Sequence, residues 1–179
     1  SLDEAEKGYR QALAARHRAG EIESLSNGWT LDGLAVTVAE KGDHAAAEPI
    51  ARESLAMRRK LLGPNHVEVG MSLSTLGEIL SSQKKFDEAE TVLSEATEVF
   101  RNHGGPEHPY VAYGLLGLGN VLLRNGDATA AETPMRQALG IRLRKLSEDS
   151  WEIAAARSDL ADCLIQLGRF DEAEALLVP

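Results

Sequence analysis

Residues 76–96, LGEILSSQKKFDEAETVLSEA, decide the fold. Large apolar residues recur in this stretch at spacings of three and four, which predicts two amphipathic helices joined by a turn at residues 83–85. The arrangement returns at a fixed period of 42 residues along the chain. Such a period indicates a repeat protein in which each repeat is a helical hairpin. Two registers carry the repetition: Ala-Glu pairs begin at Ala5, Ala47, Ala89, Ala131 and Ala173, and Leu followed by a small residue begins at Leu34, Leu76, Leu118 and Leu160.

Glycines at two kinds of position fit a helical hairpin. Glycine in a helix interior costs about 1 kcal/mol relative to Ala, so Gly77 and Gly119 indicate that two helices cross there at close range. Between the two expected helices, glycine ends the first helix by adopting a left-handed conformation. One repeat has Lys84 at this position, which we expect to be tolerated but less favourable. The turn glycines are Gly42, Gly126 and Gly168.

The composition limits the classes of function. Hydrophobic residues make up 43% of the 179 residues and aromatic residues only 4%, which fits a helical core built from Ala and Leu. A net charge of −9 argues against nucleic-acid binding and favours a neutral to basic protein or peptide partner. The most apolar stretch, Gly114–Leu123, is ten residues long, well short of the roughly 20 that span a bilayer. A single cysteine excludes an internal disulfide and, with no secretory signal, favours a cytoplasmic location.

We therefore expect one helical array over residues 1–179. The chain opens at Ser1 without a methionine, which suggests a piece of a longer protein. The last hairpin ends inside its second helix at Pro179, so we expect an uncapped edge that continues into further chain or associates with a second copy. The expected parts are the second helix of a partial repeat at 2–19, full repeats at about 24–62, 67–103 and 109–146, and a partial repeat at 150–179.

The hairpin resembles the tetratricopeptide repeat. The residues that carry the resemblance are Leu76, Gly77, Leu80, Phe86, Ala89, Leu93 and Ala96 in one repeat and Leu160, Ala161, Leu164, Phe170, Ala173 and Leu177 in the last. The resemblance implies an all-α, right-handed superhelical solenoid of antiparallel helix hairpins. A 42-residue repeat with Gly-Pro after the second helix is similar to the kinesin-light-chain type and to arrays in bacterial multidomain signalling proteins.

The resemblance implies a protein-interaction scaffold whose concave groove is lined by the first helices and binds a peptide or partner segment. Exposed Trp, Tyr and Met are favoured contact residues in such a groove. Trp29 and Tyr113 have an equally weighted alternative role, which is to cover the seam between repeats. By register, the expected groove residues are Trp29, Asp32, Val36, Met71, Ser74, Glu78, Tyr113, Leu116, Asn120, Arg124, Asp162 and Gln166.

Two specific binding modes of the family are not carried over to this chain. Light-chain arrays commonly show an Asn pair just before the Leu-small pair, whereas this chain has residues such as Asp32-Gly33 and Ser74-Thr75 there. A chaperone-binding subclass grips a terminal carboxylate with Lys, Asn and Arg. Only Asn120 and Arg124 match that set, and the acidic residues at the other positions would repel a carboxylate.

Two sets of charged residues have structural explanations. The Glu of each Ala-Glu pair lies near the start of a second helix, where a negative charge favours the helix dipole by about 0.3 to 1 kcal/mol. Basic clusters at residues 58–60 and 142–145 lie near second-helix ends, where cations are equally favourable. The functional alternative for these clusters is an anion or phosphopeptide contact on the convex side.

The sequence does not indicate a catalytic, cofactor or metal site. His103, Glu107 and His108 form the best metal-ligand cluster, but His108 recurs as His66 one period earlier, which favours a structural role in the loop. Cys163 lies between apolar residues and is expected to be a small buried hydrophobe. We expect no enzyme activity. The alternative to a scaffold is a regulatory or sensor array inside a larger signalling enzyme, such as a bacterial kinase or protease.

Overall fold

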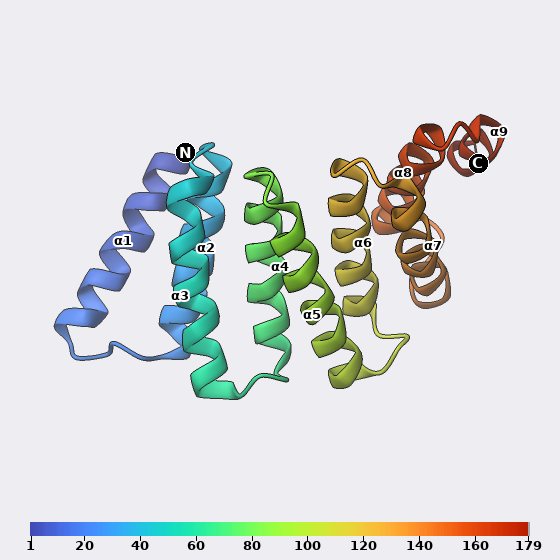
Figure 1. The fold of residues 1–179 in the computed structure, drawn as a ribbon. Coiled ribbons are helices and arrows are strands. Elements are labelled where there is room, and N and C mark those ends of the chain that lie inside the picture. Colours follow the sequence, from blue (N-terminus) through green and yellow to red (C-terminus); the bar gives the residue numbers. More distant parts are fainter. Residues whose placement is uncertain (179) are drawn as a thin grey trace.

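The computed structural model describes residues 1–178, and over these residues the chain forms nine α-helices and no strand (Figure 1). This confirms the all-α solenoid expected from the repeats. Pro179, expected at the end of the last helix, lies outside the described residues. The helices are α1 Leu2–Arg18, α2 Leu25–Glu40, α3 His44–Leu62, α4 Val67–Ser82, α5 Phe86–Gly104, α6 Pro109–Arg124, α7 Ala128–Lys145, α8 Trp151–Gln166 and α9 Phe170–Leu177.

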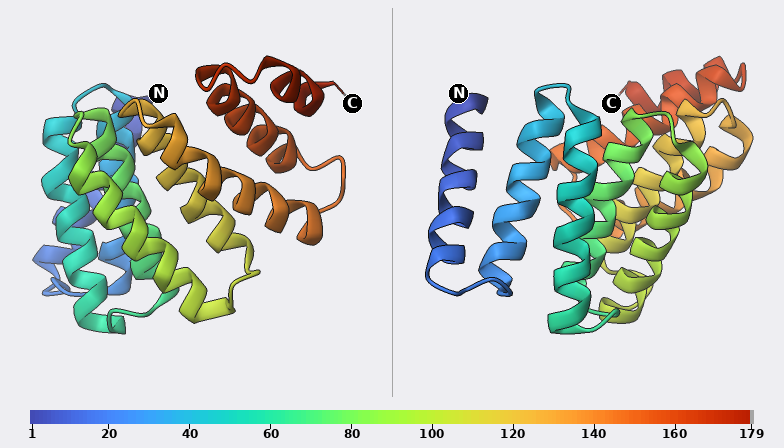
Figure 2. Two further views of the ribbon diagram at one scale, coloured as in Figure 1. Left: turned by 45° about the vertical axis from the view of Figure 1, so that its right-hand side comes forward. Right: turned by 60° about the vertical axis from the view of Figure 1, so that its left-hand side comes forward.

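The helices pair into antiparallel hairpins that stack along one axis. The hairpins are α2 with α3, α4 with α5, α6 with α7 and α8 with α9, and each second helix also packs against the first helix of the next hairpin. Helix α1 packs against α2 in the way that the other second helices pack against their following hairpin. One continuous core therefore runs through the stack. Figure 2 shows the stacked hairpins from two further sides.

The stack curves because its two sides pack differently. The first helices α2, α4, α6 and α8 contact one another from hairpin to hairpin, whereas no contact joins α3 with α5, α5 with α7 or α7 with α9 in the described chain. The closer spacing places the first helices on the inner side of the curve. We call the surface formed by these four helices the concave face and the surface formed by α1, α3, α5, α7 and α9 the convex face.

Small residues allow the two helices of a hairpin to approach closely. Ala89 at the repeated Ala-Glu position is fully buried. A side chain at Gly77 would place its Cβ 2.5 Å from Leu93 Cγ, and one at Gly119 would lie 2.6 Å from Met135 Cγ. Real Cβ contacts are never that short, so only glycine fits at these two crossings. The close approach expected from the mid-helix glycines is confirmed.

The turns within the hairpins share one backbone conformation. Gly42 and Gly126 have φ of 89°, and Gly168 has φ of 74°. Lys84 occupies the equivalent position with φ of 62°, although this left-handed region costs a residue with a Cβ about 1 to 2 kcal/mol. The repeat therefore imposes the turn geometry even where the sequence lacks the glycine.

Candidate protein-binding face

Exposed apolar side chains line the concave face. Trp29 on α2 is 59% exposed, Met71 on α4 is 37% exposed and Tyr113 on α6 is 38% exposed. These three residues occupy the same position in consecutive repeats, so they form a row across the first helices. Val36, two turns further along α2, is also exposed. Aromatic and methionine side chains that remain open on such a surface are the residue types that contribute most to protein binding.

Trp29 and Tyr113 also join neighbouring repeats. The Trp29 indole N–H donates to Glu68 Oε2 on α4 at 2.6 Å. The Tyr113 hydroxyl donates to Glu78 Oε1 on α4 at 3.0 Å, and its ring lies 6.5 Å from that of Phe100 on α5. Each ring therefore covers a seam between repeats, which is one of the two roles considered for these residues, and keeps part of its surface open.

Two of the expected groove residues are wrong as contact residues. Ser74 and Leu116 are buried, and the Ser74 hydroxyl donates to the Gly70 carbonyl one turn earlier in α4. They share the register of Asp32, which points toward the second helix of its own hairpin, where it pairs with Arg58. This register is therefore turned toward the interior in α2, α4 and α6, whereas its last member, Ser158 on α8, is exposed. Of the other expected residues, Asn120 is half-buried, and Glu78, Arg124, Asp162 and Gln166 are exposed.

A buried arginine joins two repeats beneath the concave face. Arg58 on α3 is only 3% exposed and forms an ion pair with Asp32 on α2. Its Nη1 also donates to Ser72 Oγ at 2.6 Å and to the Glu68 carbonyl at 3.2 Å, both on α4. The alternative of an anion contact is wrong for Arg58, since its guanidinium is used inside the protein. It is not available to an anion on the convex face.

The residues equivalent to Arg58 join the other repeats. Arg16 donates to Thr30 Oγ1 at 2.6 Å, and Arg142 donates to the Glu152 carbonyl at 2.6 Å, so each of these arginines binds the first helix of the next hairpin. In α5 the equivalent residue is Phe100. The seam between α5 and α6 is therefore apolar where the other seams are held by a guanidinium.

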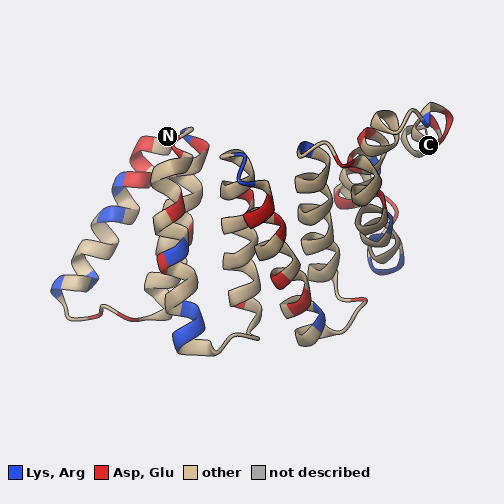
Figure 3. Cartoon of the chain, in the orientation of Figure 1, with Lys and Arg blue, Asp and Glu red and all other residues tan. Residues whose placement is uncertain are grey.

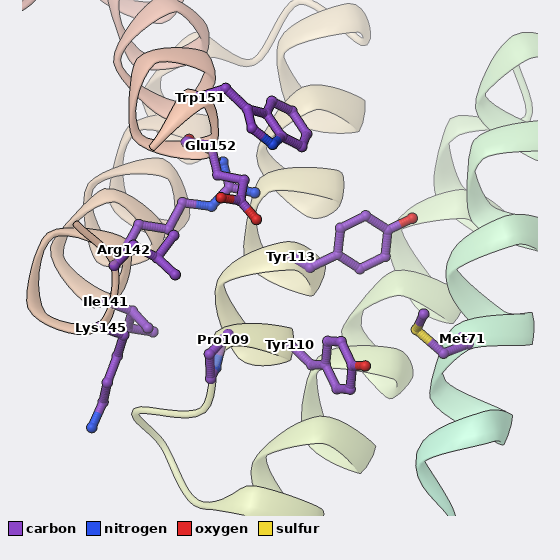
Figure 4. A pocket seen from close by; sticks show the side chains of 10 residues that line it. Met71, Pro109, Tyr110, Tyr113, Ile141, Arg142, Lys145, Trp151 and Glu152 are labelled. Carbon is purple, nitrogen blue, oxygen red and sulfur yellow. Dashed lines mark hydrogen bonds between the residues drawn. The ribbon is translucent and has the colours of Figure 1, made fainter. Parts of the chain in front are cut away.

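Phe100 builds an aromatic cluster at this seam. Its buried ring lies 5.5 Å from the ring of Tyr110, and both Tyr110 and Tyr113 of α6 remain more than a third exposed. Trp151, at the start of α8, is 75% exposed. These side chains border a pocket of about 250 Å³ that faces α4 across the concave face (Figure 4). We call it the aromatic pocket, and it is lined by Met71, Pro109, Tyr110, Tyr113, Ile141, Arg142, Lys145, Leu146, Trp151 and Glu152.

The sequence pattern indicated only part of this pocket. Met71 and Tyr113 lie in the register expected to face the groove, but Tyr110 and Trp151 stand in the first turns of α6 and α8, before that register begins. The end of α7 also contributes, although second helices were expected on the convex side. The signal that could have located the pocket is Phe100, because it interrupts arginines that otherwise recur every 42 residues.

Glu78 and Tyr113 lie between the aromatic pocket and a second hollow. Although the Glu78 side chain keeps an exposed surface, the surrounding protein removes its carboxyl partly from water, which raises its pKa, and the hydrogen bond from Tyr113 opposes this. Burial also raises the pKa of the Tyr113 phenol, and the negative charge of Glu78 adds to the increase. The hydroxyl therefore stays protonated at neutral pH and donates to the carboxylate. We call the second hollow, between α2 and α4, the acidic cleft; it measures about 260 Å³ and is lined by Val36, Ala39, Glu40, His44, Thr75, Glu78, Ile79 and Ser82.

Charge is distributed unevenly between the two faces. The four first helices contain seven carboxylates and two cationic side chains, whereas the five second helices contain fourteen carboxylates and thirteen cationic side chains. In α1 the acidic residues lie near the start of the helix and the basic residues further along it, and α3 carries residues of both signs (Figure 3). On the convex face many are paired between repeats, as Arg52 is with Glu88 at 2.8 Å and Arg136 with Glu172 at 3.1 Å. The convex face is therefore close to neutral, and the concave face is acidic.

Most carboxylates of the concave face lack a cation. Within residues 1–178, only Asp32 and Glu68 of the seven form an ion pair, in both cases with the buried Arg58. The other five are Glu40, Glu78, Glu152, Asp159 and Asp162. These five carboxylates give the concave face its negative charge.

The histidines have the structural role expected from their repetition. His66 Nδ1 accepts a hydrogen bond from the Glu68 amide, and His108 Nδ1 accepts one from the Tyr110 amide, both at 3.2 Å. Each histidine therefore caps the start of a first helix. No group of three or more His, Cys, Asp or Glu side chains in residues 1–178 is arranged to hold a metal ion.

Cys163 is fully buried, as expected. Its thiol donates to the Ala128 carbonyl at 3.2 Å. Burial raises the pKa of the thiol, so the reactive thiolate is disfavoured. No helix within the described part of the chain is both long and apolar enough to cross a membrane.

The repeat pattern of the tetratricopeptide repeat family matches residues 1–60, 40–102, 68–144 and 110–178. These overlapping matches extend over nearly the whole chain, so the chain belongs to the tetratricopeptide repeat family. Comparison with curated protein sequences gives no match.

Solved structures with kinesin-light-chain-like repeats are similar to this chain. One is a putative kinesin light chain from Podosopora anserina with nearly identical repeats, at a TM-score of 0.80 and 21% identity over 98% of this chain and 83% of that one. Another is BtubC from P. vanneervenii, at a TM-score of 0.84 and 24% identity over 98% of this chain and 70% of that one. MamA from Desulfovibrio magneticus RS-1 is less similar, at a TM-score of 0.60 and 17% identity over 98% and 93%. At these identities the likeness concerns the fold.

Proposed function

We propose that this array is a scaffold that holds an extended segment of a partner protein on its concave face. Tetratricopeptide repeats are in general protein-interaction scaffolds. The observation that carries the proposal for this chain is the aromatic pocket. Three aromatic rings, from Tyr110, Tyr113 and Trp151, remain exposed around one hollow at the centre of a seam. Aromatic side chains in a concave, partly desolvated site are the usual anchors of a protein interface.

The size of the pocket favours a side chain of a partner over a free small molecule. Its volume of about 250 Å³ lies below the range of about 300 to 1,000 Å³ that is typical of small-molecule sites. The convex face is a weaker candidate, because many of its charged side chains are already paired with each other. Residues such as Arg52 and Glu88 would have to break an existing ion pair to contact a partner.

Site-specific photo-crosslinking tests the proposal. A benzophenone amino acid is placed at Met71 on the concave face in one variant and at Ser94, an exposed position on α5, in a matched control. Both proteins are irradiated in an extract of the source cells, and the crosslinked peptide is identified by mass spectrometry. The proposal expects a defined partner peptide from the Met71 variant that is not obtained from the Ser94 variant.

The result that would overturn the proposal is equal capture at both positions, or capture at Ser94 alone, since this would move the interface to the convex face. The origin of the peptide also separates the scaffold from the regulatory alternative. A peptide from another protein supports an adaptor. A peptide from a different domain of the same chain supports an internal regulatory array.

A further inference from the structure

We propose that the segment held on the concave face is basic, and that it inserts an aromatic or large aliphatic side chain into the aromatic pocket and a Lys or Arg side chain into the acidic cleft. This inference rests on the proposed function. It adds the chemistry of the ligand, which neither the family nor the similar structures provide.

The aromatic pocket favours an apolar side chain, although the Glu152 carboxylate, which accepts a hydrogen bond from Ser150, also lines it. Its walls are the rings of Tyr110, Tyr113 and Trp151, and Met71 closes it from the side of α4 (Figure 4). Arg142 is half-buried, and this burial lowers the pKa of its guanidinium. Its Nη1 is held by the Glu152 carbonyl at 2.6 Å. Lys145 is exposed and its ammonium group points away from the rings (Figure 4).

The acidic cleft selects a cation. Glu40 and Glu78 line its two sides, and neither forms an ion pair within residues 1–178. Val36 lies one turn before Glu40 on α2, and Thr75 lies one turn before Glu78 on α4. Val36 offers an apolar surface to the aliphatic part of a long side chain. A Lys or Arg side chain would pack along Val36 and bring its charge to the two carboxylates. A ligand carboxylate would meet repulsion there and from the rest of the concave face.

One hydrogen bond connects the two hollows. Tyr113 forms a wall of the aromatic pocket, and its hydroxyl donates to Glu78 in the acidic cleft at 3.0 Å. From Met71 to Glu78 the chain advances seven residues along α4, about 10 Å, and adjacent helices lie about 8 to 10 Å apart. Combined at a right angle, these two spacings place the acidic cleft about 14 Å from the aromatic pocket. An extended peptide rises about 3.3 Å per residue, so its apolar anchor and its basic residue should be about four positions apart.

Selection from a random library of displayed twelve-residue peptides tests this chemistry. The expected enriched sequences contain Trp, Phe, Tyr, Leu or Met about four positions from a Lys or Arg, with few acidic residues. One enriched peptide is then synthesised and titrated by fluorescence anisotropy against wild type, Glu78→Gln and Trp151→Ala. The controls are Glu53→Gln, which removes an exposed charge from α3, and Phe170→Ala, which removes an exposed ring from α9.

We expect Glu78→Gln and Trp151→Ala each to weaken binding at least fivefold, and both controls to change it less than twofold. Gln still accepts the hydrogen bond of Tyr113, so the Glu78 variant removes the charge while retaining the seam contact. Replacing the basic residue of the peptide by norleucine should weaken binding to wild type and should abolish the difference between wild type and Glu78→Gln. Such non-additivity between the change in the peptide and the change at Glu78 would indicate a direct contact between the basic side chain and the Glu78 carboxylate.

The failures of this inference and of the proposed function are distinguishable. Enriched peptides that are acidic or lack a basic residue, but still lose affinity with Trp151→Ala, overturn the basic ligand and leave the concave face as the binding site. Peptides whose affinity changes only with the two control variants overturn both. Failure to enrich any sequence also overturns the inference, because a pocket and a cleft of this kind should select short peptides.

Discussion

The ion pair beneath the concave face allows a quantitative prediction. Replacing Arg58 by Met keeps most of the aliphatic part of the side chain but leaves the Asp32 carboxylate, which is itself largely buried, without its cation. Breaking a buried pair by removing one partner costs about 3 to 5 kcal/mol. Because Asp32 retains some exposure and a hydrogen bond with Ser72, we expect Arg58→Met to lower the free energy of unfolding by about 3 kcal/mol near neutral pH.

The loss should depend on pH in a defined direction. Burial already raises the pKa of Asp32 in the folded protein, in spite of the charge of Arg58. Removing Arg58 raises this pKa further. A carboxyl group with a raised folded-state pKa binds its proton more tightly when folded, so its stability contribution decreases as the pH rises through that pKa. The loss caused by Arg58→Met should therefore be largest near neutral pH and smaller in acid, where Asp32 is protonated.

Urea unfolding followed by circular dichroism at about pH 7.5 and about pH 4.5 measures both effects. The matched control is Arg52→Met, which removes an exposed cation from its ion pairs with Glu48 and Glu88 and should cost about 1 kcal/mol or less. Adding Asp32→Asn to Arg58→Met should recover part of the lost stability, because no buried carboxylate is then left unpaired. A loss no larger than that of the control, or one that does not change with pH, would refute this account of the seam.

Three further predictions concern single positions. Gly77→Ala should destabilise the protein by about 1 to 3 kcal/mol because its Cβ would overlap Leu93, whereas Gly8→Ala, with open space around it in α1, should stabilise it by about 0.5 to 1 kcal/mol; thermal unfolding compares the two. Lys84→Gly should raise the free energy of unfolding by about 1 kcal/mol, since it removes left-handed strain. Cys163 should react with a thiol reagent only on unfolding, and rapid labelling of the native protein would show that the site is open.

Much of the fold follows from the sequence because each repeat packs its two helices in the same way and therefore needs the same residue types at the same positions. Small residues recur every 42 positions where two helices cross closely, as at Gly77 and Ala89. The period and the buried positions of each helix can therefore be predicted without a structure. The histidine caps were readable for the same reason, because His66 and His108 recur one period apart. Repetition thus identifies structural residues well.

The candidate site was less predictable because it depends on how the repeats differ. Phe100 stands where α1, α3 and α7 have an arginine, and its ring packs against Tyr110 and Tyr113 of α6. The pocket also needs Trp151 from α8, which no single repeat reveals. Whether Ser74 and Leu116 face the groove depends on the rotation of each helix about its axis. The repeat pattern fixes the direction of a side chain around its helix only to within about one residue, which is about 100° of rotation. A rotation of that size is enough to turn a side chain from the groove to the interior.

The most direct test of the concave face as the binding site uses the two tryptophans of the chain. Both Trp29 and Trp151 are exposed on this face, so their indole N–H resonances report on it alone. The chain is labelled with ¹⁵N and titrated with the partner peptide identified by crosslinking, while indole and backbone amide resonances are followed by NMR. The account predicts that the Trp151 indole resonance shifts with the same affinity as binding, together with amides of α4, α6 and α8. Unmoved indole resonances, accompanied by shifts confined to amides of α3, α5 and α7, would contradict it.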